Sequence, residues 1–336
     1  MSQQQKGGSG STNIQIGTVS TGLTYSDVRD IATDLFKANF ANLMAMAKDA
    51  AETRAAEIRD EIIDRLEKDK QANPQSFSQV EKQVILLEAQ KAYAVSGDDE
   101  LKEILVNAVI GASSAPERSK KSIVLGEAVK IAPLLTKNQI KALGISFAIR
   151  FVNFPSTNLN QLFDTYLHAI NLTERHIDLT AGDIRHMEYL GCGTMGIGHV
   201  GFYDILKGDY HGLLCAGFSE AELQAAFHPE SLPRPMRICH RDNQKFEIAT
   251  HRQDVLDGTT WTQHQKSVAK QKIQERLIDE QSVIGELEKH SEISAYLYKQ
   301  WHESNLSNFQ LTSAGIAIGH TYIAERVPMG DLDIWL

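Results

Sequence analysis

The sequence has few cysteines, no long apolar run and none of the paired motifs that mark common metal or nucleotide sites. Its 336 residues include three cysteines, Cys192, Cys215 and Cys239. This odd number in a long chain excludes a disulfide framework and favours a reducing compartment. Apolar runs fall short of the roughly 18 residues that a membrane span needs, and residues 1–11 lack the hydrophobic region of a secretory signal. We therefore expect a cytoplasmic protein without a transmembrane segment.

The charge balance of the chain is acidic. It carries 43 acidic and 34 basic side chains, with a net charge of −9. Proteins that coat nucleic acid need an excess of basic residues to displace counterions. The composition therefore argues against general nucleic-acid binding, although a local basic face is compatible with it.

The sequence matches the motifs of known enzyme sites only partially. Gly191 to Gly196 match G-x-G-x-x-G, but a helical pattern precedes them and no βαβ unit follows, so we interpret Gly191 as a helix end. His240 begins a segment similar to the kinase H-R-D loop, but the asparagine that follows is not at the spacing that the kinase loop requires. Cysteines and histidines lack the paired spacing of a zinc site. We predict no catalytic residue, no metal and no cofactor, and the sequence favours a non-enzymatic protein.

The N-terminal residues 1–23 form a separate segment. Residues 1–11 are rich in Gly, Ser and Gln, and residues 13–19 then alternate apolar and small polar side chains, as a β-strand does. A single strand leaves its backbone groups unpaired. We therefore expect Ile14, Ile16 and Val19 to pair with copies of the same strand. An unstructured tail is the alternative.

A very long helix is predicted next. From Tyr25 to Lys70 the chain has neither glycine nor proline and is rich in strong helix formers. At 1.5 Å per residue such a helix reaches about 70 Å, which is typical of a coiled coil or an inter-subunit stalk. Its apolar stripe includes Val28, Leu35, Leu43, Ile58, Ile62 and Leu66. Two helices that meet near residues 49–53 are the alternative.

The middle of the chain continues as helices, which with the long helix make a helical domain over residues 24–172. The pattern predicts helices after capping boxes at Ser78 with Glu81 and at Thr136 with Gln139. Further helices are expected over residues 101–112, 120–135 and 158–170. Consecutive strand patterns are missing, which argues against a parallel α/β sheet.

The composition changes beyond residue 172. All twelve histidines lie between His168 and His320, and glycines concentrate over residues 191–217. Residues 228–262 carry three prolines and read as a loop with a short hairpin, while residues 261–289 and 311–326 have helical patterns. We expect a mainly α protein with a long N-terminal helix, a helical middle and an α+β domain over residues 173–336.

Several segments resemble the Abi-alpha family of bacterial abortive-infection proteins. Residues 183–191 look like that family's helix and LGL turn, and residues 309–318 resemble its closing LTxxGxxF helix. Residues 98–109 and 131–143 are similar to two further motifs of the family. The resemblance implies a winged-helix-like C-terminal unit with a helical insertion and a role in antiviral defence. Residues 11–40 also look like the leader of a group of uncharacterised bacterial proteins, which implies a bacterial origin.

These observations predict a homo-oligomeric defence protein that senses a phage component or harms its host cell. Its predicted interface consists of Ile14, Ile16, Val19, Val28, Leu35, Leu43, Ile58, Ile62 and Leu66. The alternative is a winged-helix regulator that binds nucleic acid through Arg234, Arg237, Arg241, Lys245 and Arg252. An enzyme that uses His240 or the cysteine and histidine set is a third hypothesis.

Overall fold

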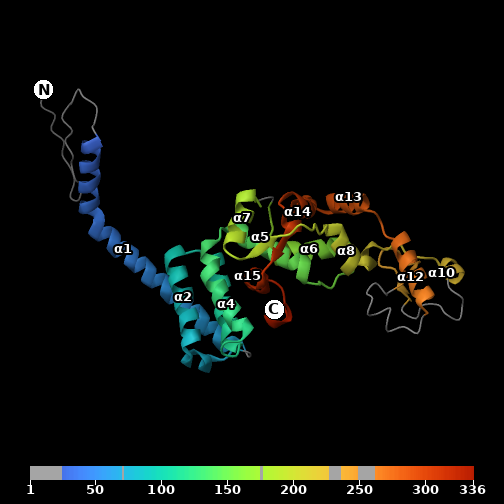
Figure 1. Ribbon diagram of the computed structural model, residues 1–336, viewed down its shortest axis with the longest axis horizontal. Coiled ribbons are helices and arrows are strands. Elements are labelled where there is room, and N and C mark those ends of the chain that lie inside the picture. The colour runs from blue at the N-terminus through green and yellow to red at the C-terminus, as the bar shows by residue number, and fades with distance from the viewer. Residues whose placement is uncertain (1–24, 70–71, 175–176, 227–235, 249–261) are drawn as a thin grey trace. The chain divides into compact units, whose positions relative to one another are not determined.

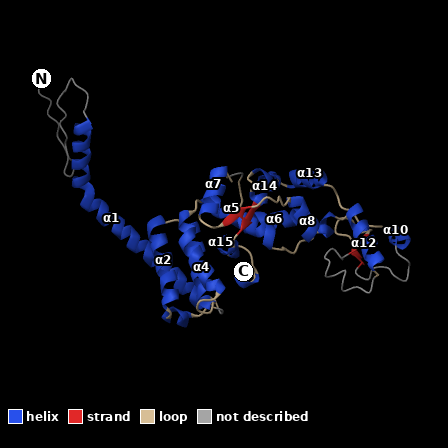
Figure 2. Ribbon diagram, in the orientation of Figure 1, coloured by secondary structure: helices blue, strands red, loops and turns tan. Residues whose placement is uncertain are grey.

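A computed structural model describes residues 25–69, 72–174, 177–226, 236–248 and 262–336 (Figure 1). The fold is mainly helical, as predicted, and Figure 2 shows its few strands as small red patches among the helices. Contacts divide the chain into two units, residues 1–53 and 54–336. Within the described parts, no helix is long and apolar enough to cross a membrane.

The first half of the chain is helical throughout. Its helices are α1 (Tyr25–Lys68), α2 (Val80–Ser96), α3 (Asp99–Ser114), α4 (Lys120–Ile131), α5 (Lys137–Phe151), α6 (Leu159–Ala169) and α7 (Ala181–Tyr189). Short 3-10 turns lie at Pro74–Ser78 and Ala132–Leu134. Helix α2 ends because Gly97 takes the left-handed backbone conformation, with φ of 58°.

One of the two predicted capping boxes in this region is confirmed and the other is wrong. Helix α5 begins in the box formed by Thr136 and Gln139, each side chain bonded to the other residue's backbone N–H. Helix α2 instead starts after Gln79, with no side-chain cap. The carboxylate of Glu81 is used elsewhere, because it accepts hydrogen bonds from the backbone of Arg118 and the hydroxyl of Ser122.

The second half mixes short helices with four strands in the described parts. They are β1 (Gly193–Met195), α8 (Phe202–Asp209), α9 (His211–Leu214), α10 (Glu220–Ala226), β2 (Met236–Ile238), β3 (Phe246–Ile248), α12 (Gln263–Glu275), α13 (Glu280–His290), α14 (Glu292–Glu303), β4 (Phe309–Leu311) and α15 (Ser313–Ala324). One 3-10 turn, Leu306–Asn308, directly precedes β4, and another, Leu332–Ile334, follows α15.

The hairpin predicted within residues 228–262 is confirmed by the antiparallel pair β2–β3. The single helix predicted over residues 261–289 is wrong, because the chain breaks between α12 and α13. At the break Leu277 forms a β-bridge with Cys215. Asp279 then caps α13 by accepting a hydrogen bond from the backbone N–H of Ser282.

The glycine-rich segment after α7 is a structural turn. Gly191 has a φ of 75° and directly follows the last residues of the helix, which confirms its interpretation as a helix end. Strand β1 then pairs antiparallel with β4, with Gly193 opposite Leu311 and Met195 opposite Phe309. This pairing joins two segments that are far apart in the sequence.

The main core lies where α15 packs against α5, the most extensive helix contact among the described elements (Figure 1). Helices α3, α4 and α14 add buried side chains such as Leu105, Leu125 and Trp301 to the same cluster. The predicted division between residues 172 and 173 therefore does not coincide with a break in the core. A smaller cluster contains Cys215, Phe218, Leu223, Ile248, Ala269 and Ile273.

Candidate functional site

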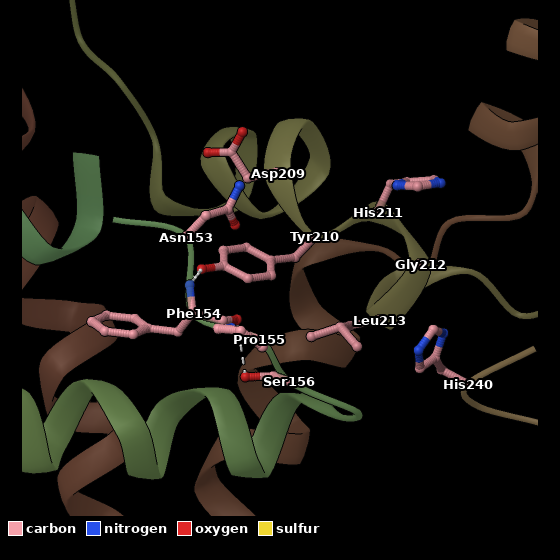
Figure 3. Close-up of a pocket in the computed structure, with 10 residues that line it drawn as sticks. All are labelled: Asn153, Phe154, Pro155, Ser156, Asp209, Tyr210, His211, Gly212, Leu213 and His240. Carbon is pink, nitrogen blue, oxygen red and sulfur yellow. Dashed lines mark hydrogen bonds between the residues drawn. The ribbon is translucent and has the colours of Figure 1, made fainter. Parts of the chain in front are cut away.

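A cavity of about 290 Å³ lies where three segments of the chain meet (Figure 3). The connection from α5 to α6 supplies Asn153 to Ser156, the junction of α8 and α9 supplies Asp209 to Leu213, and the turn after β2 supplies His240. Phe154, Tyr210 and Leu213 are largely buried apolar parts of the lining, and Asn153, Ser156, Asp209, His211 and His240 add polar side chains to it. Such a combination is typical of small-molecule sites.

Hydrogen bonds hold the first two segments together. The backbone N–H of Phe154 donates to the hydroxyl of Tyr210 at 2.8 Å, and the hydroxyl of Ser156 donates to the carbonyl of Phe154 at 3.3 Å; both bonds are drawn in Figure 3. The phenol of Tyr210 thus anchors a connection that lacks regular structure.

The imidazole of His240 is oriented by a buried carboxylate. Its Nδ1 lies 3.1 Å from Oε1 of Glu247, which is fully buried, and the backbone N–H of His240 also donates to that carboxylate at 3.4 Å. Since a carboxylate only accepts hydrogen bonds, Nδ1 is the donor in this bond, and in the neutral ring Nε2 is then the acceptor. Burying a carboxylate is costly unless it is well paired, and these two bonds from His240 select the tautomer with its proton on Nδ1 whenever the ring is neutral.

A second cavity of about 250 Å³ adjoins the first and shares His240 and Leu213 with it. The guanidinium of Arg241 lies in its wall, where it donates to the carboxylate of Glu286 and, at 3.1 Å, to the carbonyl of Leu213. Side chains at the start of α6, Thr157 to Asn160, complete the lining. Because Glu286 neutralises Arg241, the second cavity offers hydroxyl and amide groups more than net charge. The first cavity has the carboxylate of Asp209 in its lining.

This set of residues can bind a small polar molecule, and Nε2 of His240 can accept a proton or a hydrogen bond. The cysteines are unsuited to nucleophilic chemistry, because all three are buried thiols. Burial raises the pKa of Cys192 to about 12 and that of Cys215 to about 11. Across the described residues, no group of three or more His, Cys, Asp or Glu side chains is placed to hold a metal ion.

Sequence reasoning singled out His240 but missed Glu247 and Tyr210. Seven positions separate His240 from its carboxylate, and no linear motif joins them. The available signal was the hairpin, because the two antiparallel strands β2 and β3 bring residues on either side of their turn together. Tyr210 comes from a distant part of the chain and carries no such signal.

The predicted oligomer interface falls into three groups. Ile14, Ile16 and Val19 lie outside the described residues. Val28, Leu35 and Leu43 belong to α1, and their side chains are likewise outside the description. Ile58 and Ile62 are buried in the chain's own core, and Leu66 packs against it. The last three side chains therefore have little or no surface to offer to a second copy.

The basic residues predicted to bind nucleic acid also lie partly outside the described residues. Arg234 and Arg252 lie outside the described residues, and Arg237 is described only as a backbone position in β2. Arg241 pairs with Glu286, and the ammonium of Lys245 lies 3.2 Å from the carboxylate of Asp242. The two described side chains are thus held by carboxylates of their own chain.

Comparison with known proteins gives one result. The model of a family described as “:-like” matches residues 22–336. No curated protein and no solved structure matches the chain.

Proposed function

The chain belongs to the “:-like” family, and we propose that it works as a non-enzymatic homo-oligomer in antiviral defence of the abortive-infection type. The defence role is supported by the resemblance of residues 183–191 and 309–318 to abortive-infection motifs. Self-assembly is supported by the exposed alanine and methionine side chains of α1 at residues 45–50. The proposed assembly acts in the cytoplasm, and a phage component is its proposed trigger or target.

The observation that carries the proposal is the exposure of residues 45–50 of α1. Residues 45–50 are all exposed, although four of these six are alanine or methionine, and Met46 is 70% exposed. Helices in proteins owe most of their stability to packing of an apolar face. Ile58 and Ile62 of α1 are buried in the core of residues 54–336, whereas the exposed turn at residues 45–50 is suited to packing between chains.

Charge substitutions in α1 test this proposal. In the full-length protein, Met46→Glu should raise the dissociation constant of the assembly at least about tenfold, because a carboxylate would have to be buried in the interface. Lys48→Glu is the control, since Lys48 is an exposed residue of the same helix that pairs with Glu52. Equal dissociation constants for wild type and Met46→Glu would refute a role of this turn in assembly.

In this proposal, residues 173–336 form a winged-helix-like unit with a helical insertion, and the hairpin β2–β3 takes the position of a wing. The fold-level support is limited to that hairpin and the helices around it. Nucleic-acid binding through this unit ranks below self-assembly, since Arg241 and Lys245 are paired with carboxylates. If it occurs, affinity must fall steeply with salt.

A second candidate function is binding of a small, hydroxyl-bearing or amide-bearing molecule in the His240 cavity. The observation in its favour is the buried Glu247, which presets the tautomer of His240 beside a formed cavity. Ligand-observed NMR with a library of small polar fragments, on wild type and on His240→Leu, tests it. Fragments that bind wild type and lose binding in the variant support the site, and equal binding to both proteins refutes it.

A further inference from the structure

The outer face of α2 carries an apolar row that nothing in the described part of the chain covers. We call the outer stripe the set Val80, Val84, Leu87, Lys91 and Val95. Four of its five members are apolar, with exposed fractions of 73% for Val80, 43% for Val84, 48% for Leu87 and 84% for Val95. Steps of three and four residues keep all five on one side of the helix.

This stripe lies opposite the face that α2 turns to the core. The buried face of α2 consists of Lys82, Ile85, Ala89 and Tyr93. At about 100° per residue, these positions lie half a turn away from the outer stripe. An ordinary surface helix has polar residues on its outer face. Helix α2 therefore has two apolar faces, and only one of them is occupied by its own chain.

We propose that the outer stripe packs against the outer stripe of a second copy, antiparallel and across a two-fold axis. This inference rests on the proposed homo-oligomeric function and adds a second contact to that of α1. A single row of this kind, about 22 Å long, is smaller than the roughly 800 Å² per partner of a stable interface. The α2 contact therefore acts together with α1 rather than alone.

The order of residues in the stripe favours this occupant, because the row reads nearly the same in both directions. When two copies run antiparallel with Leu87 beside Leu87 at the axis, Val80 of each copy lies beside Val95 of the other. Isologous two-fold contacts require such self-complementarity. A parallel arrangement would instead place Lys91 beside Lys91, which like charges disfavour.

Charge complementarity supports the same arrangement. In its own chain the ammonium of Lys91 lies 3.1 Å from the carboxylate of Glu88; Lys91 is exposed and Glu88 is half-buried. In the antiparallel pair, Lys91 lies beside Val84 of the second copy, and Glu88 of that copy is one turn away. The aliphatic stem of Lys91 can then cover Val84 while its ammonium bridges both carboxylates.

Cysteine cross-linking of the full-length protein tests the inference. The three native cysteines are buried, so an introduced surface cysteine is the reactive one. Leu87→Cys should form a covalent dimer with a short bismaleimide, because the two side chains meet at the axis. Val80→Cys should not link to itself, but it should link to Val95→Cys when the two variants are mixed. Ile123→Cys, at a position 49% exposed on α4, is the matched control and should not link.

The outcomes separate this inference from the proposed function. If the protein is oligomeric but Leu87→Cys does not link, or if Val80→Cys links to itself, the antiparallel α2 contact is refuted while self-assembly stands. If the protein is monomeric, both the antiparallel α2 contact and the proposed self-assembly are refuted. As a second readout, Leu87→Glu should weaken assembly at least about tenfold, whereas Ile123→Glu should leave it unchanged. Equal effects of the two substitutions would also overturn the inference.

Discussion

The carbonyl oxygen of Cys192 lies so close to Gly315 that a Cβ on this glycine would be 1.9 Å from it. The same carbonyl accepts a hydrogen bond from the backbone of Thr312, just before α15 begins. Both contacts fix the start of α15 against the turn that follows α7. Because the obstructing atom is backbone, no side-chain movement can make room for a methyl group.

Gly315→Ala should therefore destabilise the protein by about 3 kcal/mol, the upper end for overpacked sites. Chemical denaturation, followed by helical circular dichroism, measures this loss as a lower midpoint. Gly285→Ala in α13 is the control, because a Cβ there meets nothing within 4 Å. Alanine is the better helix former by about 1 kcal/mol, so this variant should be as stable as wild type or slightly more so. Similar losses in both variants would contradict the close approach.

A second prediction concerns acid sensitivity. Burial lowers the pKa of His320 below its ordinary value of 6.5. The ring packs against Phe147 and Trp335, which also contact each other, and its Nε2 donates to the carbonyl of Gly330. The unfolded chain binds the proton more readily than the folded one, so the free energy of unfolding should fall as the pH drops from about 6.5 towards the folded pKa.

His320→Phe keeps an aromatic ring at this position but cannot be protonated. It should be less stable than wild type at pH 7.5, since the bond to Gly330 is lost, and its unfolding free energy should fall less steeply between pH 6.5 and 5. Denaturation at several pH values measures both slopes. The slope that remains reports on other groups, including His302, whose pKa burial also lowers. If the unfolding free energy falls with pH equally steeply in the two proteins, His320 does not contribute to the acid sensitivity.

A third prediction contrasts Thr136, which forms the capping box of α5, with Ser78, which was predicted to cap α2 and does not. Thr136→Ala should destabilise the protein by about 1 kcal/mol, because its hydroxyl caps α5. Ser78→Ala should change stability by less than about 0.5 kcal/mol, since Ser78 lies on the surface and caps no helix. Denaturation midpoints of the two variants decide the matter, and a larger loss for Ser78→Ala would reverse our assignment of the helix starts.

The tautomer of His240 gives a fourth prediction. Nitrogen NMR of selectively labelled histidine should show Nδ1 protonated and Nε2 unprotonated when the ring is neutral, because Glu247 accepts from Nδ1. Glu247→Leu should remove this preference. Glu286→Gln, which alters the partner of the neighbouring Arg241, should retain it. A neutral His240 with its proton on Nε2 in wild type would show that Glu247 does not orient it.

The comparison of Thr136 with Ser78 shows what local sequence can predict. A capping box depends on residues within one turn, so Thr136 and Gln139 formed it as expected. Glu81 has the same spacing from Ser78, but its carboxylate bonds to Arg118 and Ser122, which are remote in the sequence. The helical character of the chain was predictable because periodicity is local, whereas competition from a distant partner was not.

The strand pairing and the candidate site depend on such distant partners. Strand β1 has three residues and finds its partner β4 more than one hundred positions later. The cavity at His240 likewise needs the α5–α6 connection and the α8–α9 junction, whose lining residues form no motif. Pattern analysis therefore singled out His240 without its carboxylate, and it gave no signal for the close approach of the Cys192 carbonyl to Gly315.

Sedimentation equilibrium of the full-length chain, from about 0.1 to 50 µM, tests the central claim that the protein acts as an assembly of copies. The account predicts a mass that is a multiple of the 37.3 kDa chain at micromolar concentration and falls on dilution. A mass of 37.3 kDa over the whole range, with Met46→Glu and Leu87→Glu no different from wild type, would contradict it.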